Sequence, residues 1–172
     1  MPSVDNHVTI EVTDEMTGED WRVLTTWREH VFSPEGLGMD WIGGKHHILA
    51  KAAGQVIGHI GFDMYSLLID GKESQCIGVG AVVVVPEHQG RHLPERMFSM
   101  LRAWRDDNSP NLPLALFCPS ALVSYYEKHN FINYLREVFY IQKGSYQKSK
   151  FNFMTDRLID AGESVHIPSN PW

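Results

Sequence analysis

The clearest pattern of hydrophobic and polar positions lies between residues 76 and 105. An apolar, β-branched run at residues 82–85 ends at Pro86, and a polar turn with Gly90 follows it. Hydrophobic side chains then recur at helical spacing, at Leu93, Met97, Met100, Leu101 and Trp104. This pattern predicts a buried strand, a tight loop and a helix. Because loop N–H groups and the positive end of a helix dipole attract anions, the unit is a candidate phosphate site.

The residues before this unit predict one helix and several strands. Alternation predicts a strand at residues 7–12, and the spacing of Trp21, Leu24 and Trp27 predicts a helix at residues 17–31. Strands at residues 45–53, at residues 55–69 and from about residue 74 form an expected antiparallel meander, with the turn Asp70-Gly71 between the last two.

The residues after it predict further strands and a helix. Apolar runs predict strands at residues 111–118, 131–142 and 151–154, and a helix opens at Pro119 and Ser120. The tail from residue 160 to residue 172 shows no period. This order predicts an α+β fold in a single domain, residues 1–172, with a central mixed, mostly antiparallel sheet and helices on both faces.

Composition narrows the classes of protein. The chain has 172 residues, of which 43% are hydrophobic, so it is long enough for a substantial core. It lacks an apolar run of membrane length and a secretory pattern at its start, so we expect a cytoplasmic protein without a membrane partner. The net charge of −6 disfavours nucleic acid and favours a cationic ligand. Cys76 and Cys118 predict neither a disulfide nor a metal site.

The histidines do not predict a metal site either. His88 and His92 are separated by Gly90 in a turn rather than placed on one helix face, and no third ligand stands near them. His46 and His47 point to opposite faces of a strand and cannot bind one ion together. We therefore expect no metal.

The strand, loop and helix resemble the acyl-CoA-binding motif of the GNAT superfamily of N-acetyltransferases. The matching residues are Val82, Val84, Pro86, Gln89, Gly90 and Arg91. His92 and Pro94 depart from the superfamily's glycine pattern, and a basic residue at the position of His92 is similar to the aminoglycoside 2′-N-acetyltransferases. Further pieces resemble that branch: Asp40-Trp41, Gly43-Gly44 with His46, His59, the segment S-Y-Y-E-K-H-N-F at residues 124–131, and the final Trp172.

The resemblance implies acetyl-CoA as co-substrate, with its pantetheine arm along the strand and its pyrophosphate on the loop. The residues implied are Val82, Val83, Val84, Gln89, Gly90, Arg91, His92, Leu93 and Pro94. Tyr126 matches the position whose phenol protonates the departing CoA thiolate. The implied substrate-binding residues are Glu35, Asp40, Gly80, Ala81 and the carboxylate of Trp172, whereas Asp63, Asp156, Asp160 and Glu163 are further acids that could contact a cationic substrate.

One departure concerns the proton of the amine. Gly80 stands where the resembling enzymes have an acid that accepts this proton through water. Glu87, His59, Asp63 or a water held by strand carbonyls are alternatives, and an amine with a depressed pKa would need no base.

The resemblance implies an acetyl-CoA-dependent transferase that acetylates the 2′-amine of an aminoglycoside antibiotic and so gives resistance. Because Gly80 and Asn170 replace acids of the resembling enzymes, kasugamycin is a further expected substrate. The partner would be a small, cationic aminosugar, and homodimers are common in the superfamily. Two alternatives stay open: a GNAT acyltransferase for another small-molecule or protein amine, and a non-catalytic acyl-CoA-binding protein.

Overall fold

The computed structural model describes residues 7–31, 36, 38–159 and 162–172. The elements in chain order are β1 (Val8–Thr13), α1 (Gly18–Val31), β2 (His46–Ala52), β3 (Gln55–Ile69), β4 (Lys72–Val84), the 3-10 helix η2 (Pro86–His88), α2 (Leu93–Asn108), β5 (Leu114–Cys118), the 3-10 helix η3 (Ser120–Leu122), α3 (Val123–Lys128), β6 (Ile132–Tyr134), β7 (Glu137–Gln142), β8 (Ser145–Lys148), β9 (Asn152–Thr155) and β10 (Ser164–Ile167).

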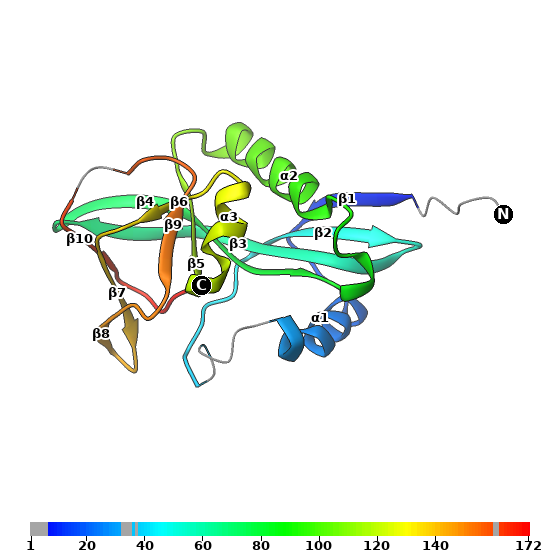
Figure 1. Cartoon of the computed structure of the whole chain (residues 1–172), viewed down its shortest axis with the longest axis horizontal. Helices are drawn as coiled ribbons and strands as arrows, with labels where there is room; N and C mark the ends of the chain where they lie inside the picture. The colour runs from blue at the N-terminus through cyan, green and yellow to red at the C-terminus, as the bar shows by residue number, and fades with distance from the viewer. Residues whose placement is uncertain (1–6, 32–35, 37, 160–161) are drawn as a thin grey trace.

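The described strands form one mixed sheet built around β3 and β4 (Figure 1). Its order is β6-β9-β5-β4-β3-β10-β7-β8, and β2 pairs with the first half of β3 and with β1. Most pairs are antiparallel, whereas β4 with β5 and β7 with β10 are parallel. The expected α+β fold with a mixed, mostly antiparallel sheet is confirmed.

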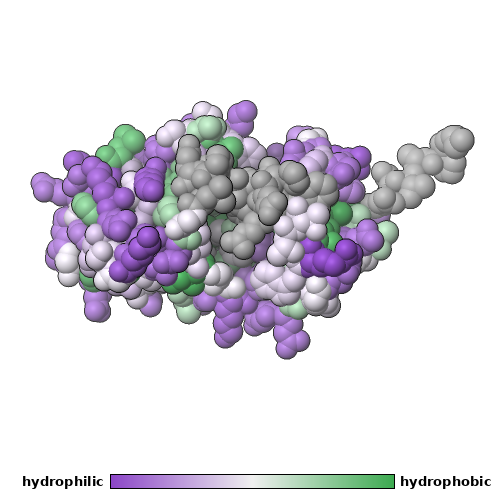
Figure 2. Space-filling view, turned by 90° about the horizontal axis from the view of Figure 1, so that it is seen from below, coloured by the Kyte–Doolittle hydropathy of each residue, from purple (hydrophilic) through white to green (hydrophobic). Residues whose placement is uncertain are grey.

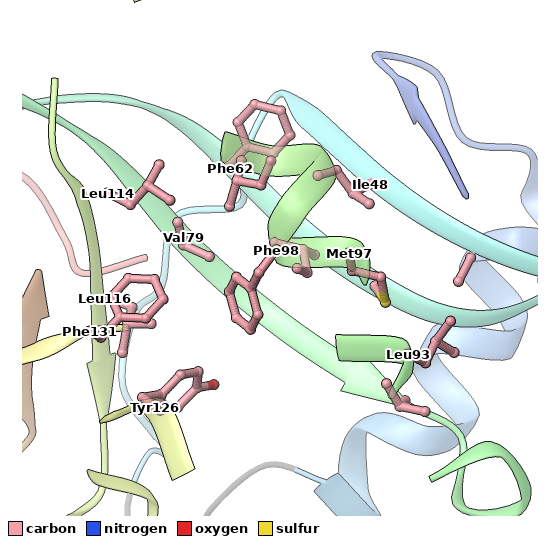
Figure 3. Packing of buried hydrophobic residues seen from close by; sticks show 14 of the residues in the cluster. Ile48, Phe62, Val79, Leu93, Met97, Phe98, Leu114, Leu116, Tyr126 and Phe131 are labelled. Carbon is pink, nitrogen blue, oxygen red and sulfur yellow. The ribbon is translucent and has the colours of Figure 1, made fainter. Parts of the chain in front are cut away.

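Helices cover both faces of this sheet, as Figure 1 shows for α1 and α2. Met97 and Phe98 of α2 are fully buried in the main core, together with Ile48 of β2 and Phe62 of β3 (Figure 3). On the other face, Leu24 of α1 packs with Leu49 and Val56 in a smaller cluster. The amphipathic patterns of both helices are therefore satisfied by burial against the sheet. No helix in the described part of the chain is long and apolar enough to cross a membrane.

The C-terminal third differs from the sequence prediction. Residues 131–142 form two strands instead of the single strand expected, because the chain turns at Leu135, which is 85% exposed. β6 pairs with β9, whereas β7 pairs with β8 and β10. The strands β8 and β10 were not predicted.

Candidate active site

The strands β4 and β5 lie side by side for only three residue pairs. Residues 77–79 pair with residues 114–116, and the parallel ladder then ends. β4 continues to Val84, so the last part of this strand has an edge without a strand partner among the described residues. An extended ligand can add to such an edge through main-chain hydrogen bonds.

A β-bulge lies where the two strands separate. The register of β3 with β4 shifts at this point, so that Ala81 and Val82 stand opposite Ile60 alone. Ala81 has a φ of 48°, in the left-handed region that side chains other than glycine seldom adopt. The bulge also inverts the alternation of the strand: Val79 before it and Val84 after it both belong to the core under α2.

The bulge divides the three valines that we expected to contact pantetheine. Val85 donates its N–H to the carbonyl of Ile57 in β3 (2.9 Å). Because polar groups alternate along a strand, Val83 also turns its N–H and carbonyl toward β3. Val82 and Val84 turn theirs toward the open edge. The structure therefore leaves Val82 and Val84 available for the expected role and uses Val83 within the sheet.

The loop between β4 and α2 offers backbone donors. Gln89 donates its N–H to Pro86 O (3.2 Å) and its side-chain amide to Val84 O (3.0 Å), so this residue shapes the loop and has no free backbone donor, contrary to our expectation. The N–H groups of residues 90–93 have no acceptor among the described residues. These donors precede the positive end of the α2 dipole, an arrangement that binds phosphate.

His92 and Pro94 fit this loop without a glycine. His92 has a φ of 55°, which explains why glycine would suit the position. Its ring is exposed and lies 3.3 Å from the carboxylate of Glu95. Leu93, the first residue of α2, is buried in the main core, and Pro94 follows in the first turn, where no N–H is needed.

Tyr126 belongs to the same side of the sheet as α2. Its ring packs edge-on against Phe98 and Phe131, and only 7% of the residue is exposed. In Figure 3 its hydroxyl points out of the cluster, on the side where β4 ends and Leu93 lies. Burial raises the pKa of this phenol, so it is protonated at neutral pH, as a general acid must be.

Trp172 is anchored on the opposite face of the sheet. Its ring stacks on Tyr65 of β3 (4.4 Å between centroids), and its Nε1–H donates to Ala115 O of β5 (3.1 Å). Gly78 of β4 provides the space, because a Cβ there would lie 2.5 Å from Trp172 Cε2. These contacts fix the main chain of Trp172 in one position.

The carboxyl group of Trp172 lies over Gly80. A Cβ at Gly80 would be 2.9 Å from the carboxyl carbon and 3.4 Å from a carboxyl oxygen. The space into which a side chain at residue 80 would project is therefore occupied by this carboxyl group. The neighbouring Ala81 is exposed at the bulge.

The remaining predicted substrate residues lie before β2. Asp40 is exposed, and its backbone N–H and carbonyl both bond to the amide of Gln142 (3.0 and 2.8 Å). Ile42 donates its N–H to Pro171 O (2.8 Å), which ties this loop to the residue before Trp172. Glu35 and Asp160 lie outside the described residues.

The geometry narrows the alternatives for the base. His59 is 2% exposed, and both of its ring nitrogens are hydrogen-bonded, to Ala81 O (2.7 Å) and to His47 (3.0 Å). Burial lowers the pKa of His59 to about 4. It therefore offers no free lone pair to a substrate. The carboxylate of Asp63 accepts the N–H groups of Lys45 and Met64.

Two further acids have different surroundings. The Asp156 carboxylate is 4% exposed and pairs with Arg105, so it is a structural group and not a substrate ligand. Glu87 is exposed in η2, where nothing holds its side chain toward the gap.

Sequence reasoning missed His47, Tyr65 and Gly78. The alternation of Gly78 and Gly80 on one face of a predicted strand signals the close approach of another group. Nothing in the sequence pattern identified Trp172 as that group.

Comparisons with known proteins agree with this geometry. Residues 36–133 match the sequence profile described as an acetyltransferase (GNAT) domain. No curated protein sequence matches the chain.

Solved structures share the fold at low sequence identity. Escherichia coli ElaA superposes with a TM-score of 0.59 at 15% identity, over 87% of this chain and 99% of its own. An acyl-CoA N-acyltransferase from Pseudomonas aeruginosa gives 0.56 at 19%, over 87% and 98%. A GNAT family acetyltransferase from Brucella melitensis, in complex with acetyl-CoA, gives 0.50 at 18%, over 94% and 93%.

Proposed function

Because the chain belongs to the GNAT acetyltransferase family, whose profile matches more than half of it, we propose that it acetylates the 2′-amino group of an aminoglycoside antibiotic. Acetyl-CoA is the acetyl donor, and the modification gives resistance to the drug. Kasugamycin belongs with the typical deoxystreptamine drugs among the substrates to be tested.

The open edge of β4 and the loop that follows it support acetyl-CoA as the donor. Val82 and Val84 would pair with the pantetheine arm, and the free N–H groups of residues 90–93 would hold the pyrophosphate, with charge from Arg91 and His92. The similar fold from Brucella melitensis was crystallised with acetyl-CoA, which agrees with this assignment.

The reaction is a direct transfer between the two substrates. The neutral amine attacks the thioester carbonyl carbon, the new C–N bond forms and the C–S bond breaks. Val82 N–H, at the open edge, donates to the carbonyl oxygen as it gains negative charge. Tyr126 gives a proton to the departing thiolate, and the carboxylate of Trp172 takes the proton that the amine loses.

The position of the Trp172 carboxyl group carries the choice of substrate. It lies over Gly80, beside the bulge, where a negative charge would attract a substrate ammonium group. Asp40 adds a second carboxylate on the loop that is tied to Pro171. Outside the grey residues, the face seen in Figure 2 is mostly hydrophilic, which suits a polar sugar.

The test is thiol release from acetyl-CoA with a panel of amines. Kanamycin B carries a 2′-amine and kanamycin A a 2′-hydroxyl, so they form a matched pair; kasugamycin, spermidine and a lysine peptide complete the panel. We expect turnover with kanamycin B or kasugamycin and little with kanamycin A.

Three results would contradict the proposal. Turnover with the peptide or spermidine alone would favour an acyltransferase for another amine. Equal turnover with both kanamycins would remove the 2′-amine as the acceptor. Silence on every amine, with acetyl-CoA still raising the melting temperature, would favour a non-catalytic acyl-CoA-binding protein.

A further inference from the structure

A buried pair of histidines ends at the bulge of β4. His59 of β3 and His47 of β2 are 2% and 6% exposed, and Nε2 of His59 lies 3.0 Å from Nδ1 of His47. The other ring nitrogen of His59, Nδ1, lies 2.7 Å from the carbonyl oxygen of Ala81. Trp21 of α1 packs edge-on against His47 and covers the pair. The chain of contacts thus runs from α1 to the strand edge that faces β5.

The hydrogen bonds fix the tautomer of both rings. A carbonyl oxygen only accepts, so Nδ1 of His59 carries the proton and donates it to Ala81 O. In a neutral imidazole the other nitrogen accepts, and His47 must then donate from its own Nδ1. Burial lowers the pKa of both histidines, so both rings are neutral at pH 7.

This bond determines the direction of one backbone donor. In a trans peptide the carbonyl of one residue and the N–H of the next point in opposite directions. When the Ala81 carbonyl turns to His59, the Val82 N–H turns away from it, toward the open edge of β4. Ala81 adopts a left-handed conformation that costs free energy for a residue with a Cβ, so the orientation needs support from outside the strand.

We propose that His59 is a positioning residue for acetyl transfer: by holding the Ala81 carbonyl, it aims the Val82 N–H at the thioester carbonyl oxygen of acetyl-CoA. His47 supports it by keeping the proton of His59 on Nδ1. This inference rests on the acetyl-CoA part of the proposed function and is independent of which amine accepts the acetyl group.

Two variants of His59 separate this role from simple packing. His59→Asn retains an N–H donor at the δ position, whereas His59→Leu has the same branching without a donor. For any amine that the wild type accepts, we expect His59→Leu to lower kcat by about tenfold to hundredfold, with KM for acetyl-CoA changed less than about twofold. His59→Asn should recover most of that loss.

Binding of two donors gives a readout that needs no acceptor amine. S-Ethyl-CoA has a methylene in place of the thioester carbonyl of acetyl-CoA. Wild type and His59→Asn should bind acetyl-CoA more tightly than S-ethyl-CoA, and His59→Leu should bind both equally. If no amine is acetylated, this comparison still tests His59, so a failure of the proposed substrate and a failure of this inference give different results.

Infrared spectroscopy tests the wild type alone, in case His59→Leu does not fold. With acetyl-CoA labelled by ¹³C at its carbonyl, binding to the wild type should lower the carbonyl stretching frequency, because Val82 N–H polarises the bond. An unshifted frequency, or equal losses of affinity for both donors in His59→Leu, would overturn the inference.

Discussion

At the scale of single residues, Gly80 and Trp172 share one small volume. Gly80→Ala would place a Cβ 2.9 Å from the carboxyl carbon of Trp172, a distance that requires one of the two to move. Since the carboxyl group is the mobile partner, we expect kcat/KM for the amine to fall at least about tenfold, because a misplaced catalytic group loses much of its effect. The dissociation constant of acetyl-CoA should be unchanged.

Gly18→Ala is the matched control for this substitution. No atom lies within 4 Å of a Cβ built at Gly18, so the added methyl group meets nothing. Steady-state kinetics of the two variants, with acetyl-CoA binding measured by calorimetry, make the comparison. If Gly80→Ala keeps the wild-type kcat/KM, the Trp172 carboxylate has no part in handling the amine.

Residue types alone predicted only part of the candidate site. Tyr126, Gly80 and Trp172 were found through a family resemblance, but the contact between the last two depends on how the tail folds back over β4. The pairing of His47 with His59 arises from the register of β2 with β3, which sequence spacing does not reveal. In the same way, a motif match at Gln89 could not show that its N–H bonds to Pro86 O.

At the scale of elements, predictability follows burial. Most residues of β3 are buried at least on one face and α2 buries one stripe, so both had clear periodic patterns. All four residues of β8 are exposed, and its pairing with β7 leaves no hydrophobic alternation to read. The four residues of β10 are defined by long-range pairing with β3 and β7, which no local window contains.

One ion pair joins α2 to the strands beside the candidate site. Asp156, just after β9, pairs with Arg105 of α2 and accepts the N–H of Leu114 at the start of β5 (2.8 Å). Both side chains of the pair are almost completely buried. Asp156→Ala would leave Arg105 buried without this partner, so we expect a loss of about 3–5 kcal/mol in the free energy of unfolding.

The neighbouring acid provides a control for the ion pair. Asp106 also contacts Arg105 (2.9 Å), but its side chain is 58% exposed. Asp106→Ala should therefore cost less than about 1 kcal/mol. Urea unfolding followed by circular dichroism measures both values, and equal losses would show that burial does not decide the contribution of Asp156.

At the scale of the whole molecule, the sheet separates the two halves of the reaction. The loop before α2, together with Tyr126, lies on one face, whereas Trp172 packs on the other, against Gly78 and Gly80. The gap between β4 and β5 connects these faces at the bulge. The two substrates would thus approach from opposite sides and meet at the thioester, a geometry that favours direct transfer without an enzyme nucleophile.

The buried histidines also make the stability of the whole fold depend on pH. Burial lowers the pKa of His59 from 6.5 to about 4, so the unfolded chain binds a proton that the folded chain excludes between these values. Stability is therefore fully present above pH 6.5 and falls as the pH drops toward 4, by about 3 kcal/mol from His59 alone. His47, whose pKa is also lowered by burial, adds to the same trend, although Asp14 opposes it and His46 reinforces it.

Urea unfolding at pH values from 7.5 to 4 measures this dependence. In His59→Asn the group that titrates is absent, so the free energy of unfolding should fall less steeply below pH 6.5 than in the wild type, whatever the stability of the variant at pH 7.5. His88→Asn, which removes a histidine from the loop before α2, should instead run parallel to the wild type. Parallel curves for His59→Asn and the wild type would show that His59 takes up a proton equally well in the folded and unfolded chain, and the buried neutral pair would then be wrong.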